Sequence, residues 1–104
     1  MALFHWGLER FIRYVSENKP THIEVTTDLD EGGDAQYVCE HFGVFTGYYE
    51  NGKPIVARKK YGGTKSTPEE MAPLFDADIQ RLQEMKIDVF KIKGFVNESD
   101  KEHS

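Results

Sequence analysis

The sequence predicts an α+β fold in which helices cover one side of a single antiparallel sheet. Three observations predict this class. Residues 22–29 alternate between apolar and polar side chains, as a half-buried strand does. An Asn51-Gly52 pair joins two further strand-like runs. Apolar residues recur at helical spacing over 2–17 and again over 68–85.

The first element is expected to be an amphipathic helix over residues 2–17. Its apolar stripe is formed by Phe4, Leu8, Phe11, Ile12 and Val15. Asn18 and Pro20 end the helix, because proline cannot continue it. In the strand over 22–29 that follows, the odd-numbered residues from Ile23 to Leu29 should face the core.

The segment that follows the loop 30–33 has two interpretations. A strand over 36–42 would place Tyr37, Cys39 and His41 on one side. A short helix over 35–42 is favoured, because Asp34 suits the N-cap and Gly43 suits the position just past the C-terminus.

The next two strands, 44–49 and 55–60, are expected to form a hairpin. Asn-Gly is the preferred pair for a two-residue type I′ turn, in which both residues take positive φ. This turn pairs Tyr48 with Ile55 and Thr46 with Ala57.

The second long helix is predicted to begin in a capping box at residues 67–70. Thr67 is the N-cap, Pro68 the first helical residue and Glu70 the residue that reaches back. The apolar face of the helix is formed by Met71, Phe75, Ile79 and Leu82. A last strand over 87–96 should direct Phe90, Ile92 and Val96 inward and Lys91 and Lys93 outward.

The order strand–helix–strand–strand–helix–strand after residue 21 is that of the ferredoxin-like split βαββαβ plan. It predicts a four-stranded antiparallel sheet with two helices on one face and an extra N-terminal helix. We expect one α+β domain over residues 1–96, with the N-terminal helix in 1–18 and the βαββαβ core in 21–96. The polar residues 97–104 are expected to be a disordered tail.

Composition narrows the range of functions. The 104 residues carry 18 acidic and 13 basic side chains, a net charge of −5, and this acidity argues against nucleic-acid binding. The single cysteine, Cys39, excludes an internal disulfide. The start of the chain has no signal-peptide pattern and no run is long enough to span a membrane, so a cytoplasmic protein is expected.

The sheet face opposite the two helices of the βαββαβ core is the first candidate surface. Either the N-terminal helix, folded across the sheet, or a second copy of the chain is expected to cover it. This face is a candidate site for a protein partner, a second copy of the chain or a small anionic ligand. The residues expected on it are His22, Glu24, Phe45, Tyr49, Arg58, Lys60, Lys91 and Lys93. The basic, glycine-containing loop 58–67, with Lys65, is a second candidate for an anion. An ordinary cap and a solvated turn explain that loop more simply.

Catalytic and metal sites have weaker support. His22 and Glu24 could form an acid–base pair on one strand face, but ordinary sheet-surface electrostatics explains them equally. Cys39 and His41 share a face only if the segment around them is a strand. We therefore expect no catalytic residue, no metal and no cofactor.

The hypothesis that these features favour is a small non-enzymatic binding or regulatory module that acts through protein–protein contact or homodimerisation. The alternative is a protein that binds an anion or a small phosphorylated ligand, with or without a minor enzymatic activity, through the basic sheet face and the loop 58–67.

Overall fold

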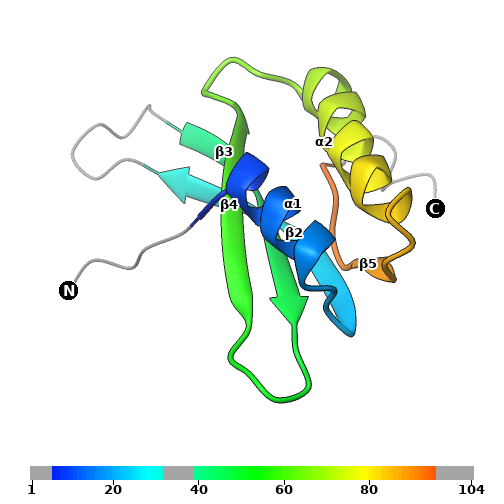
Figure 1. The fold of residues 1–104 in the computed structure, drawn as a ribbon. Coiled ribbons are helices and arrows are strands. Elements are labelled where there is room, and N and C mark those ends of the chain that lie inside the picture. The colour runs from blue at the N-terminus through cyan, green and yellow to red at the C-terminus, as the bar shows by residue number, and fades with distance from the viewer. Residues whose placement is uncertain (1–5, 32–38, 96–104) are drawn as a thin grey trace.

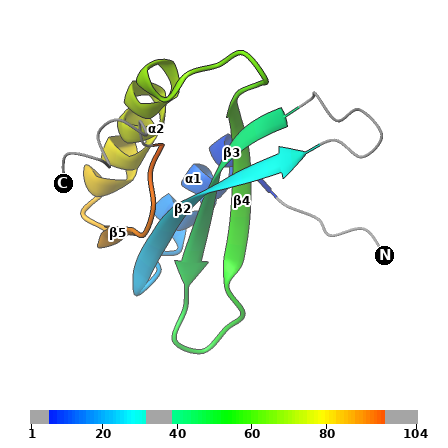
Figure 2. The same cartoon turned by 180° about the vertical axis from the view of Figure 1, so that it is seen from behind.

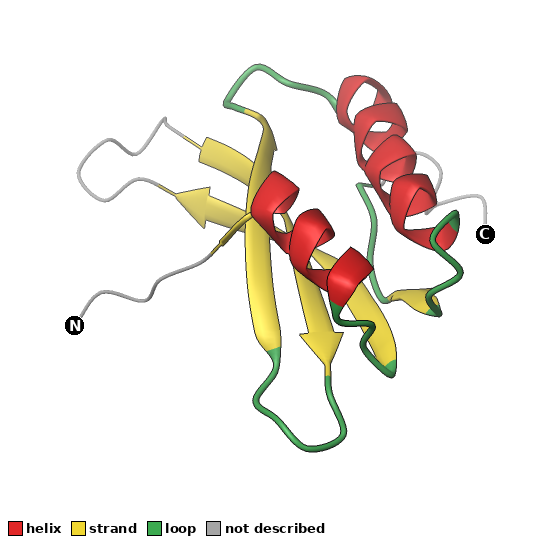
Figure 3. Cartoon of the chain, in the orientation of Figure 1, coloured by secondary structure: helices red, strands yellow, loops and turns green. Residues whose placement is uncertain are grey.

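The computed structural model describes residues 6–31 and 39–95 of the chain. Its elements, in chain order, are β1 (Trp6–Gly7), α1 (Leu8–Glu17), β2 (His22–Glu31), β3 (Cys39–Tyr48), β4 (Ile55–Gly62), α2 (Pro68–Gln83) and β5 (Val89–Lys91). The strands form one five-stranded sheet in the order β1-β4-β3-β2-β5. Both helices lie on the same side of this sheet (Figures 1 and 3).

The ferredoxin-like prediction is wrong, because the sheet is mixed and its strand order differs. β3 pairs antiparallel with β2 and with β4, so the three strands form a meander. The two short edge strands pair in parallel, β1 with β4 and β5 with β2. A ferredoxin-like sheet would be antiparallel and would place another strand between β2 and β3. The α+β class is confirmed; the topology is not.

The error begins at residues 39–42, which belong to β3 and not to a helix. The strand pairs with β2 from Cys39 opposite Glu31 to Tyr48 opposite His22. Gly43 and Gly47 occupy positions on its core-facing side, which removes the apolar alternation by which a strand is usually recognised. The other residues of the predicted helix, 35–38, lie outside the described part of the chain.

The hairpin between β3 and β4 is shifted by one residue from the predicted register. Ile55 lies opposite Gly47 and Ala57 opposite Phe45. Asn51 and Gly52 do not have positive φ, so the turn is not type I′. A shift of one residue exchanges the two faces of a strand, and Phe45 is therefore completely buried.

The helices agree better with the sequence. α2 has the predicted cap, since the Thr67 hydroxyl accepts a hydrogen bond from the Glu70 backbone N–H. Its predicted apolar face is confirmed as buried, and the kink-prone Pro73 is accommodated inside the helix. α1 begins at Leu8 and not at residue 2, because Trp6 and Gly7 are extended and pair with β4.

Three aromatic rings organise the core between the helices and the sheet. Phe45, on β3, lies between Phe11 of α1 and Phe75 of α2, with ring centroids 6.3 and 5.8 Å away. The two glycines of β3 flank this ring. Phe75 lies over Gly43 and Phe11 lies near Gly47, so each helix places an aromatic side chain where the strand has no side chain.

The last strand also differs from its prediction, because only Val89–Lys91 is a strand. Lys91 faces the helices, where its ammonium group lies 2.9 Å from the Asp76 carboxylate of α2. Phe90 and Ile92, expected to be inside, are 53% and 65% exposed. The predicted position of Val96 and the predicted tail 97–104 lie outside the described residues.

Candidate functional site

The side of the sheet opposite the helices carries no other element among the described residues, and Figure 2 shows it from behind the helices. We call this surface the open face. It is formed by alternate residues of the three central strands: His22, Glu24, Thr26, Asp28 and Asp30 of β2; Glu40, Phe42, Val44, Thr46 and Tyr48 of β3; and Val56, Arg58 and Lys60 of β4.

An aromatic cluster around His22 forms one end of the open face. The imidazole ring is stacked on Tyr48, with centroids 4.8 Å apart, and meets the edge of Phe90 at 5.6 Å. His22 Nε2 lies 3.4 Å from a Glu24 carboxylate oxygen, and the Tyr48 hydroxyl donates a hydrogen bond to the other oxygen. Desolvation and this hydrogen bond to Glu24 raise the pKa of Tyr48.

This cluster brings together the acid–base pair that the sequence suggested. Neither His22 nor Glu24 lines any of the three cavities described below. Both carboxylate oxygens of Glu24 already have a neighbour in His22 or Tyr48. The arrangement therefore serves as a contact surface more readily than as a catalytic pair.

The basic residues of the open face are close to acids. The Arg58 guanidinium lies 4.0 Å over the Phe42 ring and 3.4 Å from the Asp28 carboxylate. The Lys60 ammonium lies 3.5 Å from Glu40. These two cations have partners, so the loop and face proposed for an anion offer it less free positive charge than the sequence implied.

The other predicted site residues are dispersed. Phe45 is in the core, and Lys91 is on the helix side of the sheet. The Tyr49 hydroxyl donates a hydrogen bond to the Asn18 carbonyl, beside α1 and away from the open face. Lys65 is exposed in the loop before α2, and Lys93 follows β5. The structure therefore places four of the predicted residues on the open face: His22, Glu24, Arg58 and Lys60.

A buried polar network lies on the other side of the sheet. The carboxylate of Asp78, only 5% exposed, accepts hydrogen bonds from Lys59 at 2.8 Å, Tyr61 at 2.7 Å and Arg81 at 3.1 Å. Arg81 also donates to both carboxylate oxygens of Glu9. The network joins α2 to β4 and α1.

Every charge in this network has a partner, and the pKa values reflect the pairing. Burial alone would raise the pKa of Asp78, but hydrogen bonds from Lys59, Tyr61 and Arg81 outweigh it, so the pKa is lowered. Burial, and secondarily the bond to Asp78, raises the pKa of Tyr61. This network is not predicted from the sequence, although Asp78 falls at helical spacing among buried residues of α2.

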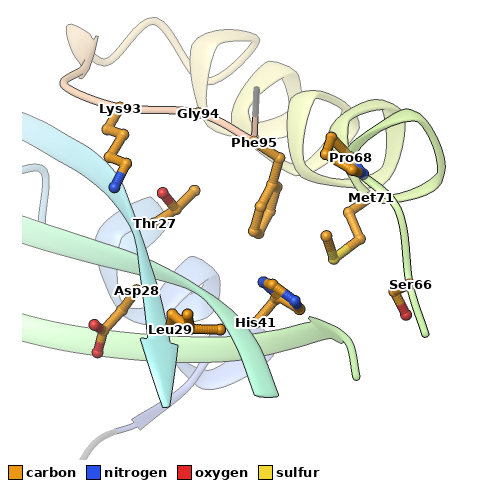
Figure 4. Close-up of a pocket in the computed structure, with 10 residues that line it drawn as sticks. All are labelled: Thr27, Asp28, Leu29, His41, Ser66, Pro68, Met71, Lys93, Gly94 and Phe95. Atoms are coloured by element: carbon orange, nitrogen blue, oxygen red, sulfur yellow. The ribbon is translucent and has the colours of Figure 1, made fainter. Parts of the chain in front are cut away.

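Cavities among the described residues accompany these features. One, of about 240 Å³, lies on the helix side of the sheet between the ends of β2 and β3, the start of α2 and the segment after β5 (Figure 4). We call it the Phe95 cavity. A second, of about 550 Å³, lies beside the hairpin turn, and a third, of about 440 Å³, lies on the outer side of α1 near Trp6.

In the described part of the chain, no three His, Cys, Asp or Glu side chains are close enough to hold a metal ion. Cys39 and His41 are both on β3, as the strand interpretation required, but no third ligand joins them. No helix among the described residues has the length and apolar character needed to cross a membrane.

Comparison with known proteins adds no further constraint. No protein-family model matches the sequence, and neither a curated protein nor a solved structure is significantly similar to it. A functional proposal for this chain therefore depends on its own geometry.

Proposed function

We propose that the protein is a binding module that associates with a second copy of itself through the open face. The observation that carries this proposal is the distribution of charge across the three central strands. On the open face, β2 contributes Glu24, Asp28 and Asp30, whereas β4 contributes Arg58 and Lys60. An acidic column and a basic column thus flank β3.

The middle column, on β3, is mainly apolar. Phe42, Val44, Thr46 and Tyr48 follow one another along it, and all four are partly buried. Val56 of β4 and Phe90 of β5 extend the apolar area on either side. Aromatic residues and arginine are enriched at protein interfaces, and an apolar centre with a charged rim is their usual anatomy.

A two-fold axis parallel to β3 makes this face complementary to itself. Rotation about such an axis stacks β3 on β3 and places β2 of one copy over β4 of the other. Asp28, Phe42 and Lys60 share one row of the sheet. Asp28 of each copy then faces Lys60 of the other. The residues of β3 face their own copies, so Phe42 faces Phe42, and Glu40, which lies 3.5 Å from Lys60 of its own chain, faces Glu40. Two sheets stacked in this way lie about 10 Å apart.

The alternative, an anion-binding function on the same face, has less support. Arg58 and Lys60 each lie beside a carboxylate of their own chain. Asp28 and Asp30, both exposed, would also repel an anion that approached the face. A surface with an acidic column and a basic column is better suited to a protein surface on which the basic column faces the acidic one and the acidic column faces the basic one. A second copy of the chain, rotated about the two-fold axis, presents its columns in that way.

The first test is the oligomeric state, measured by sedimentation velocity over a wide range of protein concentration. Wild-type protein should form a dimer, and Val44→Arg should be monomeric because it places a charge at the centre of the apolar column. Leu74→Arg is the matched control: Leu74 is 56% exposed on α2, outside the open face, so this variant should dimerise normally. Circular dichroism should show that both variants fold.

A second test uses charge reversal to identify the partner. Asp28→Lys and Lys60→Glu should each weaken self-association, because each homodimer then contains two repulsive pairs. A mixture of the two variants should form a heterodimer in which every such pair is attractive. A monomeric wild type, a Val44→Arg dimer, or a mixture no tighter than its components would overturn the proposal.

A further inference from the structure

We infer that the Phe95 cavity binds a small carboxylate with a flat or branched apolar body. The site is on the side of the sheet away from the open face, and the inference does not depend on dimerisation. Its residues come from four separate parts of the chain: β2, β3, the start of α2 with the preceding loop, and the segment 93–95 (Figure 4).

The walls of the cavity are apolar. Leu29 of β2 is 47% exposed, and Met71 of α2 and Phe95 also line the space. The Phe95 ring is held in place by Phe75 and Tyr61, whose ring centroids are 5.2 and 5.8 Å away. A ring fixed in this way offers a preformed surface on which a flat apolar group can stack.

Four uncharged or basic polar side chains line the cavity, and in Figure 4 they lie on different sides of it: Lys93 and Thr27 on one side, His41 and Ser66 on the other. The His41 ring meets Phe95 edge-on at 6.2 Å, which fixes its position at one side of the cavity. Lysine, threonine and neutral histidine can all donate a hydrogen bond. These donors around apolar walls suit an acceptor group on an otherwise apolar molecule.

The charge of the cavity favours an anion. Within the described part of the chain, Lys93 has no carboxylate partner. Asp28 is the acidic residue among those that line the cavity. Its side chain points away from the centre of the cavity in Figure 4, and its carboxylate lies 3.4 Å from Arg58. The cavity therefore has one cation, and no carboxylate among its described lining residues points into it.

The size and donor set distinguish a carboxylate from a phosphate. A volume of about 240 Å³ is below the usual range for drug-sized ligands, so the occupant has a single ring or a short branched chain. A phosphate dianion would keep a net negative charge beside one lysine, whereas a singly charged carboxylate is neutralised by the one ammonium group of the lining, that of Lys93.

The test is a titration of ¹⁵N-labelled protein with sodium benzoate, followed by amide chemical shifts. Saturable shifts are expected at Thr27, His41, Met71 and Gly94. Benzamide, which has the same shape without the charge, should bind more weakly. Lys93→Gln should weaken benzoate binding about two- to five-fold, the range expected for one partly exposed ion pair. Lys53→Gln, at the opposite end of the sheet, should leave it unchanged.

The inference would be overturned by the absence of saturable shifts at those residues, by benzamide binding as tightly as benzoate, or by equal affinities of wild type and Lys93→Gln. The same titration on monomeric Val44→Arg should give the wild-type affinity. A failure of self-association and a failure of ligand binding would thus be observed separately.

Discussion

At the scale of single residues, the most consequential side chain is the Asp78 carboxylate. Asp78 follows Met71 and Phe75 at the spacing of the buried face of α2, where an unpaired charge would be costly. Lys59, Tyr61 and Arg81 satisfy it, and within the described residues no buried side-chain polar atom lacks a hydrogen-bond partner. Helical spacing locates Asp78 in the sequence, but two of its three partners, Lys59 and Tyr61, come from β4, and only the fold identifies them.

Asp78→Ala should lower the free energy of unfolding by about 2–4 kcal/mol, because it removes the shared acceptor of three hydrogen bonds. Asp76→Ala is the matched control on the same helix; its exposed pair with Lys91 should contribute less than about 1 kcal/mol. Urea unfolding of both variants measures the difference. Equal losses would show that the buried network contributes no more than a surface pair.

The pH dependence of the Asp78→Ala effect has a definite sign. The folded state lowers the pKa of Asp78 below its ordinary value of 3.8, so its contribution is complete above that value. The contribution is lost as the pH falls through the folded pKa. The difference between wild type and Asp78→Ala should therefore be largest near neutral pH and shrink in acid, and a difference that grows in acid would contradict the role given to Asp78.

At the scale of elements, β3 explains both the packing of the helices and the error in the predicted fold. Gly43 was interpreted as the residue past a helix end, whereas it is the place on a central strand where Phe75 approaches the backbone. α2 was predicted correctly because its cap and apolar face are local features. Residues 39–48 form a strand in which the Phe75 ring of α2 fills the space beside the glycine at position 43. Because Phe75 is far away in the sequence, no local pattern around 39–48 indicates this contact.

Gly43→Ala should destabilise the fold by about 1–3 kcal/mol, because the added methyl group would meet Phe75 at 2.6 Å and Tyr61 at 2.7 Å. Gly47→Ala is the matched comparison, since the nearest atoms of Phe11 are at an ordinary 3.5 Å. Neither glycine has positive φ, so Gly47→Ala should be neutral or slightly stabilising. Thermal unfolding of the two variants provides the measurement.

At the scale of the whole molecule, the sequence predicted two helices on one sheet face and left open whether the N-terminal helix or a second copy of the chain covers the other. In the structure the N-terminal helix, α1, lies on the same side as α2. The sequence also predicted that the strand residues His22 and Glu24 face away from the core helices. The sequence could not predict which residues of the hairpin lie beside them. A one-residue change of register places Phe45 in the core and Val44 and Tyr48 on the open face. The turn sequence that was expected to fix the register does not adopt the expected conformation.

The proposed dimer should weaken as salt is added. Its charge columns attract across the interface, and added sodium chloride weakens this attraction by shortening the Debye length, which is about 10 Å at 0.1 M. The dissociation constant, measured by sedimentation at low and high ionic strength, should therefore rise with salt. A dimer that is indifferent to salt would show that the apolar column acts alone and that the columns of β2 and β4 do not face each other.

The strand order also has a consequence for how the chain folds as it is synthesised. The three central strands follow one another along the chain, so they can pair as soon as β4 has left the ribosome. The free edge of β2 must wait for β5, which is made only after α2. In that interval this backbone edge is open to strands of neighbouring nascent chains, and β5 later covers its Ile23–Val25 segment.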